Sequence, residues 1–323
     1  MEIERINQRR PDFKKCGIVG CGAVGSTIAY TLMQTNWFSE LVLIDEEGKR
    51  AEGNAADLTY GLPFGSQTDI FSGEFSDLSD CGIVILAVNG NKFQTRSARH
   101  LENMRSFPAL AEKIAHYNEE AILLVVTNPV EILTLLAKEF SAFPASRVLG
   151  LGTVLDTARL QQLIGRSLGV DSASVHSFVV GEQGPSEIPI WSFANISGVD
   201  LAHFCDFCRR GYDQSLFDSL FRQVQDSTKE IAQSKGSAAF AVAESVKRIV
   251  SAILFDEHAI LTVSSCLSGH YDLSDVALSL PCIVGRSGVK QVLEIPLSHE
   301  EEARLQASAA YLKKAVAESL LPQ

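Results

Sequence analysis

Three glycines near the start of the chain have the spacing that dinucleotide cofactors require. The pattern G-x-G-x-x-G is formed by Gly20, Cys21, Gly22, Ala23, Val24 and Gly25. An apolar stretch precedes it and a helical pattern follows, a context that separates such a motif from a chance match. The glycines permit a tight turn, a close approach of the backbone to a pyrophosphate and close helix–strand packing, while the amides at the helix start face the phosphates. We therefore predict a dinucleotide site here, with a glycine turn that binds no cofactor as the alternative.

A carboxylate further along bears on which dinucleotide is bound. Asp45 ends the second apolar stretch, 25 residues after Gly20. In that place a carboxylate accepts hydrogen bonds from the adenosine ribose hydroxyls and repels a 2′-phosphate. The sequence therefore predicts NAD rather than NADP.

The elements that must position these residues alternate between short apolar strands and amphipathic helices. The first half suggests strands at 16–20, 41–45, 83–88 and 122–126, with a helix at 23–35, and residues 150–153 close it. This alternation, with fully apolar strands, is typical of an α/β fold with a Rossmann doubly wound parallel sheet. The second half is less regular and predicts a mixed α+β domain, with strands at 175–181, 188–193 and 276–284 and helices at 215–234, 238–254 and 300–320.

Charge and composition restrict the partners. The formal net charge of −11 argues against a nucleic-acid surface, which needs clustered lysine and arginine. No apolar stretch reaches the roughly 18 residues of a membrane helix, and the first residues lack a signal-peptide core, so we expect a cytoplasmic protein that binds a small molecule. The seven cysteines do not suggest a disulfide framework, and the single C-x-x-C pair, Cys205 and Cys208, lies in a helical pattern rather than a metal site.

Six blocks along the chain resemble the NAD-dependent L-lactate/malate dehydrogenase family, and within it the lactate dehydrogenase branch. In chain order they are VGCGAVGST, LVLIDEEGKRAEGNAADLTYG, VVTNPVEILT, VLGLGTVLDTARL, VGEQGPSEIPIWS and ALSLPCIVGRSGV. The resemblance implies an NAD-binding Rossmann domain over residues 1–152 and a substrate domain over residues 153–323. It also implies a homodimer or homotetramer, and a helix near 238–254 that packs back on the cofactor domain.

The same resemblance implies a site for a carboxylate-bearing substrate. Asp156 and Arg159 match an aspartate and, three residues later, the arginine that clamps the substrate carboxylate through its planar fork. Arg99 falls where the family has a loop arginine that polarises the carbonyl. Asn128 matches an asparagine that contacts both cofactor and substrate.

The pattern breaks at the position of the proton-transfer histidine. The family block G-E-H-G-D is G-E-Q-G-P here, which puts Gln183 in place of the histidine. An amide can donate a hydrogen bond to a carbonyl, but it cannot supply a proton near neutral pH. His176 lies at opposite strand parity and is a poor substitute. General acid–base catalysis contributes about 10²–10⁴-fold, so ordinary keto-acid reduction should suffer.

Two further departures surround the expected substrate. Phe93 stands where lactate enzymes have glutamine and malate enzymes have arginine, which favours an apolar side chain on the substrate; packing within the loop is the alternative. Ala238 replaces a small hydroxyl residue and removes a hydrogen bond worth about 0.5–1.5 kcal/mol.

Three functions are compatible with these residues. The first is an NAD(H)-dependent oxidoreductase with altered chemistry, acting on a 2-keto or 2-hydroxy acid or on an imine that a keto acid forms with an amine. An iminium is already protonated, so its reduction needs no general acid. The second is a catalytically inactive NAD-binding pseudoenzyme or scaffold, and the third a weak conventional L-lactate dehydrogenase that takes its proton from water.

Overall fold

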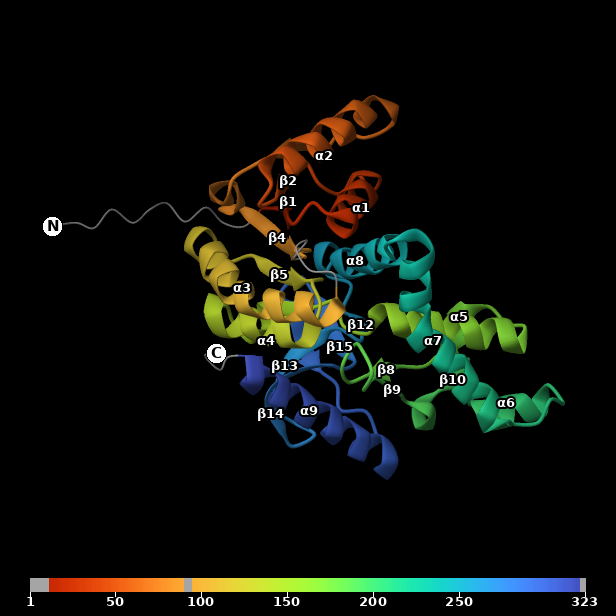
Figure 1. Cartoon of the computed structure of the whole chain (residues 1–323). Helices are drawn as coiled ribbons and strands as arrows, with labels where there is room; N and C mark the ends of the chain where they lie inside the picture. Colours follow the sequence, from red (N-terminus) through yellow and green to blue (C-terminus); the bar gives the residue numbers. More distant parts are fainter. Residues whose placement is uncertain (1–11, 90–94, 320–323) are drawn as a thin grey trace.

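An eight-stranded sheet forms the centre of the molecule, as seen in a computed structural model that describes residues 12–89 and 95–319 (Figure 1). Its strand order is β14-β13-β6-β5-β4-β1-β2-β3. The strands are β1 (Asp12–Val19), β2 (Glu40–Ile44), β3 (Asp69–Ser72), β4 (Cys81–Leu86), β5 (Ile122–Val125), β6 (Val148–Gly150), β13 (Ser264–His270) and β14 (Leu273–Ser279). Strands β1 to β6 pair in parallel in the order 3-2-1-4-5-6, which is the strand order of a Rossmann fold. The predicted fold class is confirmed.

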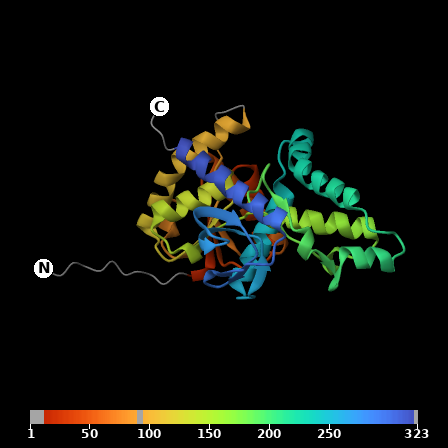
Figure 2. The same cartoon turned by 90° about the horizontal axis from the view of Figure 1, so that it is seen from below.

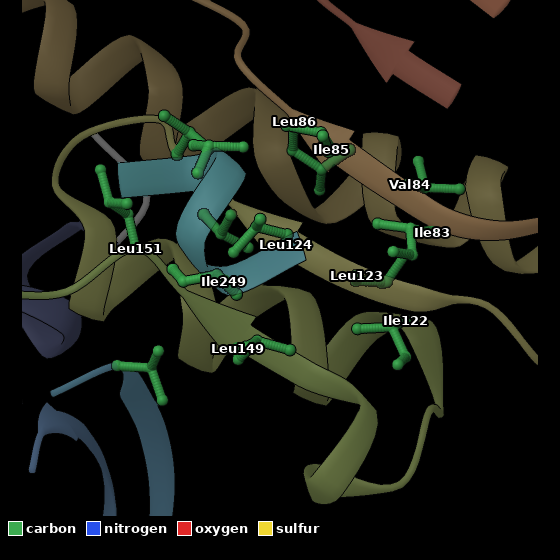
Figure 3. Close-up of a cluster of buried hydrophobic side chains, with 14 of the residues drawn as sticks. Ile83, Val84, Ile85, Leu86, Ile122, Leu123, Leu124, Leu149, Leu151 and Ile249 are labelled. Atoms are coloured by element: carbon green, nitrogen blue, oxygen red, sulfur yellow. The ribbon is translucent and has the colours of Figure 1, made fainter. Parts of the chain in front are cut away.

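Helices cover both faces of this sheet, which explains its uninterrupted apolar strands. The helices that follow the parallel strands are α1 (Ala23–Met33), α2 (Gly48–Gly61), α3 (Arg96–Tyr117), α4 (Val130–Ser141) and α5 (Val154–Leu168). Every residue of β4 and β5 is buried. Figure 3 shows part of this core, where Ile249 of α8 (Ala239–Leu254) lies beside Leu124 and Leu149. The helix near 238–254 thus packs on the cofactor half, in contact with α1, as the resemblance implied.

The remaining elements build a second, smaller core. Its buried residues come from α6 (Leu201–Phe207), α7 (Gln214–Lys235), β7 (Val175–His176), β8 (Val179–Val180) and β10 (Asn195–Ile196), with α5 against them. Strand β11 (Val199–Asp200) pairs with β10, and β9 (Ile188–Pro189) pairs with β8 and buries Ile188 in the main core. In Figure 1 the three helices α5, α6 and α7 lie together to the right of the sheet. A separate small sheet joins β12 (Ala259–Leu261), β15 (Cys282–Gly285) and β16 (Gly288–Val292). The closing helix α9 (His299–Ser319) contacts α3 and α4 and runs across the molecule in Figure 2.

Three predictions about the second half need correction. The predicted strand 276–284 is two strands, β14 and β15, separated at Leu280 and Pro281, because proline has no amide hydrogen for the ladder. The predicted strand 188–193 ends at Pro189 and continues as a 3₁₀ turn. The predicted strand 175–181 is likewise two strands, β7 and β8, which belong to different sheets. Strands β13 and β14, which were not predicted as such, extend the Rossmann sheet in antiparallel pairing.

The cysteine pair lies on a helix, as predicted. Cys205 is inside α6 and buried, while Cys208 caps its end and is exposed. Across residues 12–89 and 95–319, no three histidine, cysteine or acidic side chains are grouped so as to hold a metal ion. Over the same residues, no helix has both the length and the apolar character needed to cross a membrane.

Candidate functional site

The glycine turn between β1 and α1 has the geometry that its sequence predicts. Gly20 has a φ of 99°, and a Cβ there would lie 2.5 Å from the Ala87 carbonyl oxygen. A Cβ on Gly25 would lie 1.8 Å from the carbonyl oxygen of Gly20, so this position tolerates only glycine. A Cβ on Gly22 would meet nothing within 4 Å, which leaves open space at the start of α1. No side chain among residues 12–89 and 95–319 caps this helix, which leaves its first amides available for an anion.

Asp45 lies next to this turn, at the end of β2. Its carboxylate accepts hydrogen bonds from the amides of Cys21, at 2.6 Å, and Glu47, at 2.9 Å. Arg50 approaches the same carboxylate at 3.5 Å. The turn and the carboxylate come together because the carboxyl ends of adjacent parallel strands meet at one edge of the sheet. The start of α1 therefore offers open space and amides for a pyrophosphate, and the Asp45 carboxylate beside it is an acceptor for ribose hydroxyls. This arrangement fits NAD, which would supply or accept a hydride.

An arginine and an aspartate in the first turns of α5 form the second part of the site. Arg159 Nη1 donates to Asp156 Oδ1 at 2.9 Å and to the Thr228 hydroxyl of α7 at 2.7 Å. The side chains of Arg159 and Asp156 are 12% and 7% exposed. Arg159 Nη2 and Asp156 Oδ2 are both buried, and neither makes a hydrogen bond of ordinary geometry within the described residues. A buried guanidinium nitrogen without an acceptor is costly, so Nη2 is available for an acceptor beyond those that residues 12–89 and 95–319 supply.

Gln183 lies beside this pair, in the loop that follows β8. Its backbone amide donates to the buried carboxyl group of Glu131, and its side chain contacts the Asp156 carboxylate. Burial raises the pKa of Asp156, while the charge and hydrogen bond of Arg159, and then the amide of Gln183, oppose that rise. The glutamine therefore occupies the place beside the aspartate that the resemblance assigns to the missing histidine.

Two buried glutamates that the sequence motifs do not single out, Glu131 and Glu187, also belong to this region. Glu131, in the first turn of α4, is 1% exposed and accepts a hydrogen bond from the Ser279 hydroxyl at 2.7 Å. Burial raises its pKa to about 8. Glu187 is 4% exposed, and burial together with the negative charge of Asp156 raises its pKa to about 9. The signal in the sequence was an acid inside an apolar run, as in VEILTLL and SEIPIW.

For the other predicted site residues, the described structure gives no hydrogen bond or ion pair to Arg159, Asp156 or Gln183. Asn128 follows β5 in a cis bond to Pro129, and its carbonyl accepts a hydrogen bond from Asn103 at 2.8 Å. Ala238 is half-buried and caps the start of α8. Phe93 lies outside the described residues.

Arg99 differs from its expected placement, because it belongs to the first turn of α3 rather than to a loop. Its amide donates to the Thr95 carbonyl at 3.2 Å. No ion pair or hydrogen bond connects its side chain to Arg159 or Asp156 among residues 12–89 and 95–319.

Comparisons with known proteins show to which family this chain belongs. The model of the lactate/malate dehydrogenase NAD binding domain matches residues 14–150, and that of the lactate/malate dehydrogenase α/β C-terminal domain matches residues 153–320. The chain is 42% identical over 305 residues to an L-lactate dehydrogenase of Acetivibrio thermocellus, covering 94% of this chain and 96% of the relative. It is 41% identical over 314 residues to an L-lactate dehydrogenase of Clostridium perfringens, covering 97% and 99%.

Solved structures agree with this match. The minor L-lactate dehydrogenase of Enterococcus mundtii, in a ligand-bound form, superposes with a TM-score of 0.89 at 34% identity, covering 98% of this chain and all of that one. A lactate dehydrogenase from a deep-sea metagenome library of the Medee basin superposes with a TM-score of 0.91 at 32% identity, covering 97% and 100%. The prediction of NAD as the cofactor is confirmed by the match to the family's NAD binding domain. The chain belongs to the lactate/malate dehydrogenase family.

Proposed function

We propose that this protein is an NAD(H)-dependent oxidoreductase that holds a small carboxylate-bearing substrate on Arg159. The observation that carries the proposal is the hydrogen bonding of the Arg159 guanidinium: Asp156 and Thr228 fix Nη1, while Nη2 is buried and has no acceptor in the part of the chain that the structure describes. A carboxylate is the natural acceptor for a fixed, planar guanidinium. The two relatives compared above by sequence are named L-lactate dehydrogenases, which supports a 2-keto or 2-hydroxy acid as the substrate class.

The binding part of this proposal is tested without turnover. Arg159→Leu should leave the affinity for NADH unchanged, while binding of oxamate to the NADH complex should weaken about 10-fold to 150-fold, because a hydrogen bond to a charged group contributes about 1.5–3 kcal/mol. Thr228→Val is the matched control, since it releases Nη1 from α7 but keeps the charge, and it should weaken oxamate binding less. Equal oxamate affinity in wild type and Arg159→Leu would exclude Arg159 as the carboxylate clamp.

A second substrate class, an imine formed from a keto acid and an amine, is favoured by the pair of Asp156 and Gln183. Asp156 carries a buried oxygen without a well-formed hydrogen bond, and its neighbour Gln183 is uncharged. An iminium brings its own proton and a positive charge that this carboxylate would stabilise. NADH consumption with pyruvate should then rise when methylamine is added. A rate that does not depend on the amine would restrict the substrate to the keto acid.

We also propose that an arginine at the start of α3 polarises the substrate carbonyl. Arg99 is the residue we predict, and Arg96, the first residue of the same helix, is the natural comparison. Arg99→Ala should lower kcat for keto-acid reduction with little effect on NADH affinity. If Arg96→Ala has this effect and Arg99→Ala does not, the role belongs to Arg96.

The remaining predictions stay proposals. Phe93 and Ala238 should favour an apolar side chain on the substrate, a homodimer or homotetramer is expected, and the expected compartment is the cytoplasm. Sedimentation equilibrium measures the oligomeric state. The preference for an apolar substrate side chain is measured by comparing kcat/KM for 2-keto acids whose apolar side chains increase in length.

A further inference from the structure

Thr228 places a hydroxyl group where the apolar face of α7 ends. This helix packs against α5, the helix that carries Arg159 (Figure 1). Phe217, Phe221 and Val224 of α7 are buried in the second core. Thr228 follows Val224 by four residues and therefore lies on the same face of the helix, but it is exposed. The face that packs against α5 thus ends in a polar group that solvent reaches.

The contact between Thr228 and Arg159 occupies part of the guanidinium. The Thr228 hydroxyl oxygen accepts a hydrogen bond from Arg159 Nη1 at 2.7 Å, and Asp156 Oδ1 accepts another from the same nitrogen at 2.9 Å. Nη1 carries two hydrogens, so the protein itself uses both of them. Of the two terminal nitrogens, Nη2 is the one that lacks an acceptor among residues 12–89 and 95–319. A substrate carboxylate has two oxygens, and the second of them needs a further donor.

The Thr228 hydroxyl has a hydrogen to give. A threonine hydroxyl accepts and donates at the same time, and the bond from Arg159 uses its acceptor side. Within the described ranges 12–89 and 95–319, no group accepts the hydrogen of this hydroxyl. Ser227, the preceding residue, differs in this respect, because its hydroxyl donates to the Val224 carbonyl at 2.7 Å. Thr228 therefore offers a donor at the solvent-facing side of the Arg159 guanidinium.

We propose that the Thr228 hydroxyl donates a hydrogen bond to one oxygen of the substrate carboxylate, while Arg159 Nη2 binds the other oxygen. This inference rests on the proposed function and adds α7 to the substrate site. The bond that Thr228 accepts from the charged guanidinium polarises its O–H group and makes it a better donor. The acceptor is an ionised carboxylate, which strengthens the bond further.

Thr228→Val tests the contact, because valine keeps the shape of threonine and removes the hydroxyl. Binding of oxamate to the NADH complex should weaken about 3-fold to 10-fold, since water replaces part of a hydrogen bond that is lost at an exposed position. Thr228→Ser keeps the hydroxyl and should bind oxamate nearly as tightly as the wild type. Ser227→Ala is the matched control, because it removes a neighbouring hydroxyl whose hydrogen is used inside the helix, and it should leave oxamate affinity unchanged.

Two further measurements distinguish direct contact with the substrate from an effect through Arg159. A hydrogen bond to the carboxylate is the same in the ground state and the transition state, so Thr228→Val should raise KM for pyruvate and leave kcat unchanged. In the Arg159→Leu background, Thr228→Val should weaken oxamate binding further. If it causes no further loss there, Thr228 only orients the guanidinium and the inference is wrong.

The oxamate measurements also separate this inference from the proposed function. If Arg159→Leu weakens oxamate binding and Thr228→Val does not, the guanidinium alone binds the carboxylate, and the inference fails while the proposed function stands. A loss in Thr228→Val that Thr228→Ser shares would equally overturn the role of the hydroxyl. If neither Arg159→Leu nor Thr228→Val changes the affinity for oxamate, the proposed function fails as well.

Discussion

Replacing Gln183 by histidine should place a proton donor beside Asp156. The aspartate is 5% exposed, and its Oδ2 is buried without a hydrogen bond of ordinary geometry within the described chain. An imidazole at position 183 would donate to this oxygen, and the aspartate would stabilise the positive charge of the protonated ring. We therefore expect Gln183→His to create the aspartate–histidine pair that the family resemblance implies.

The size of the effect follows from one new charge-assisted hydrogen bond. Such a bond contributes about 1.5–3 kcal/mol, and about 1.4 kcal/mol corresponds to a factor of ten in rate. If the bond stabilises the protonated histidine through the reaction, kcat/KM for pyruvate reduction should rise about 10-fold to 10²-fold. Gln183→Asn is the control, because it keeps an amide and adds no titratable group, and it should produce no rise.

The assay is NADH oxidation with pyruvate across pH 5–9 in wild type, Gln183→His and Gln183→Asn. The donor is the protonated imidazole, with an ordinary pKa of about 6.5, so the gain should be largest at low pH and shrink as pH rises. A folded Gln183→His protein that binds oxamate but shows no gain at any pH would refute this reasoning.

Other predictions address the cofactor turn and the buried acids. Gly25→Ala should destabilise the fold by about 3 kcal/mol or more, measured by chemical denaturation, because the new Cβ would lie 1.8 Å from the Gly20 carbonyl oxygen. Gly22→Ala should leave stability unchanged, since its Cβ meets nothing within 4 Å, but should weaken NADH binding by about 1–3 kcal/mol in a fluorescence titration. For Glu131, the folded pKa of about 8 lies above the ordinary value of 4.5, so the wild type loses stability as pH rises between these values, by up to about 1.4 kcal/mol per unit. Glu131→Gln, which can still accept the bond from Ser279, should therefore exceed the wild type in unfolding free energy by a margin that grows from pH 5 to pH 7.5; a constant margin would contradict the raised pKa.

The parts of the fold that local patterns determine were predictable from the sequence. The turn at Gly20 requires a positive φ and a close approach to Ala87, and only glycine meets both requirements, so the spacing alone located it. The central strands β4 and β5 are buried on both faces and therefore appear as uninterrupted apolar runs.

Features that depend on distant parts of the chain were not predictable in this way. The pairing of β13 with β6 joins residues more than a hundred positions apart and leaves no local pattern. The loop that holds Glu187 is bound by Arg304 and Ser308 of α9, more than a hundred residues later, so a single glutamate in SEIPIW gave no indication of its environment. The proline at 281 could have divided the predicted strand 276–284, since proline interrupts a sheet ladder.

The most direct test of the proposed function is NADH consumption by the wild type with a panel of 2-keto acids, each with and without methylamine, beside Arg159→Leu. We expect NADH oxidation with at least one keto acid of apolar side chain, and a large loss of that rate in Arg159→Leu. NADH that binds but is not oxidised with any acid or acid–amine pair would contradict the account and identify the chain as an NAD-binding protein without this activity.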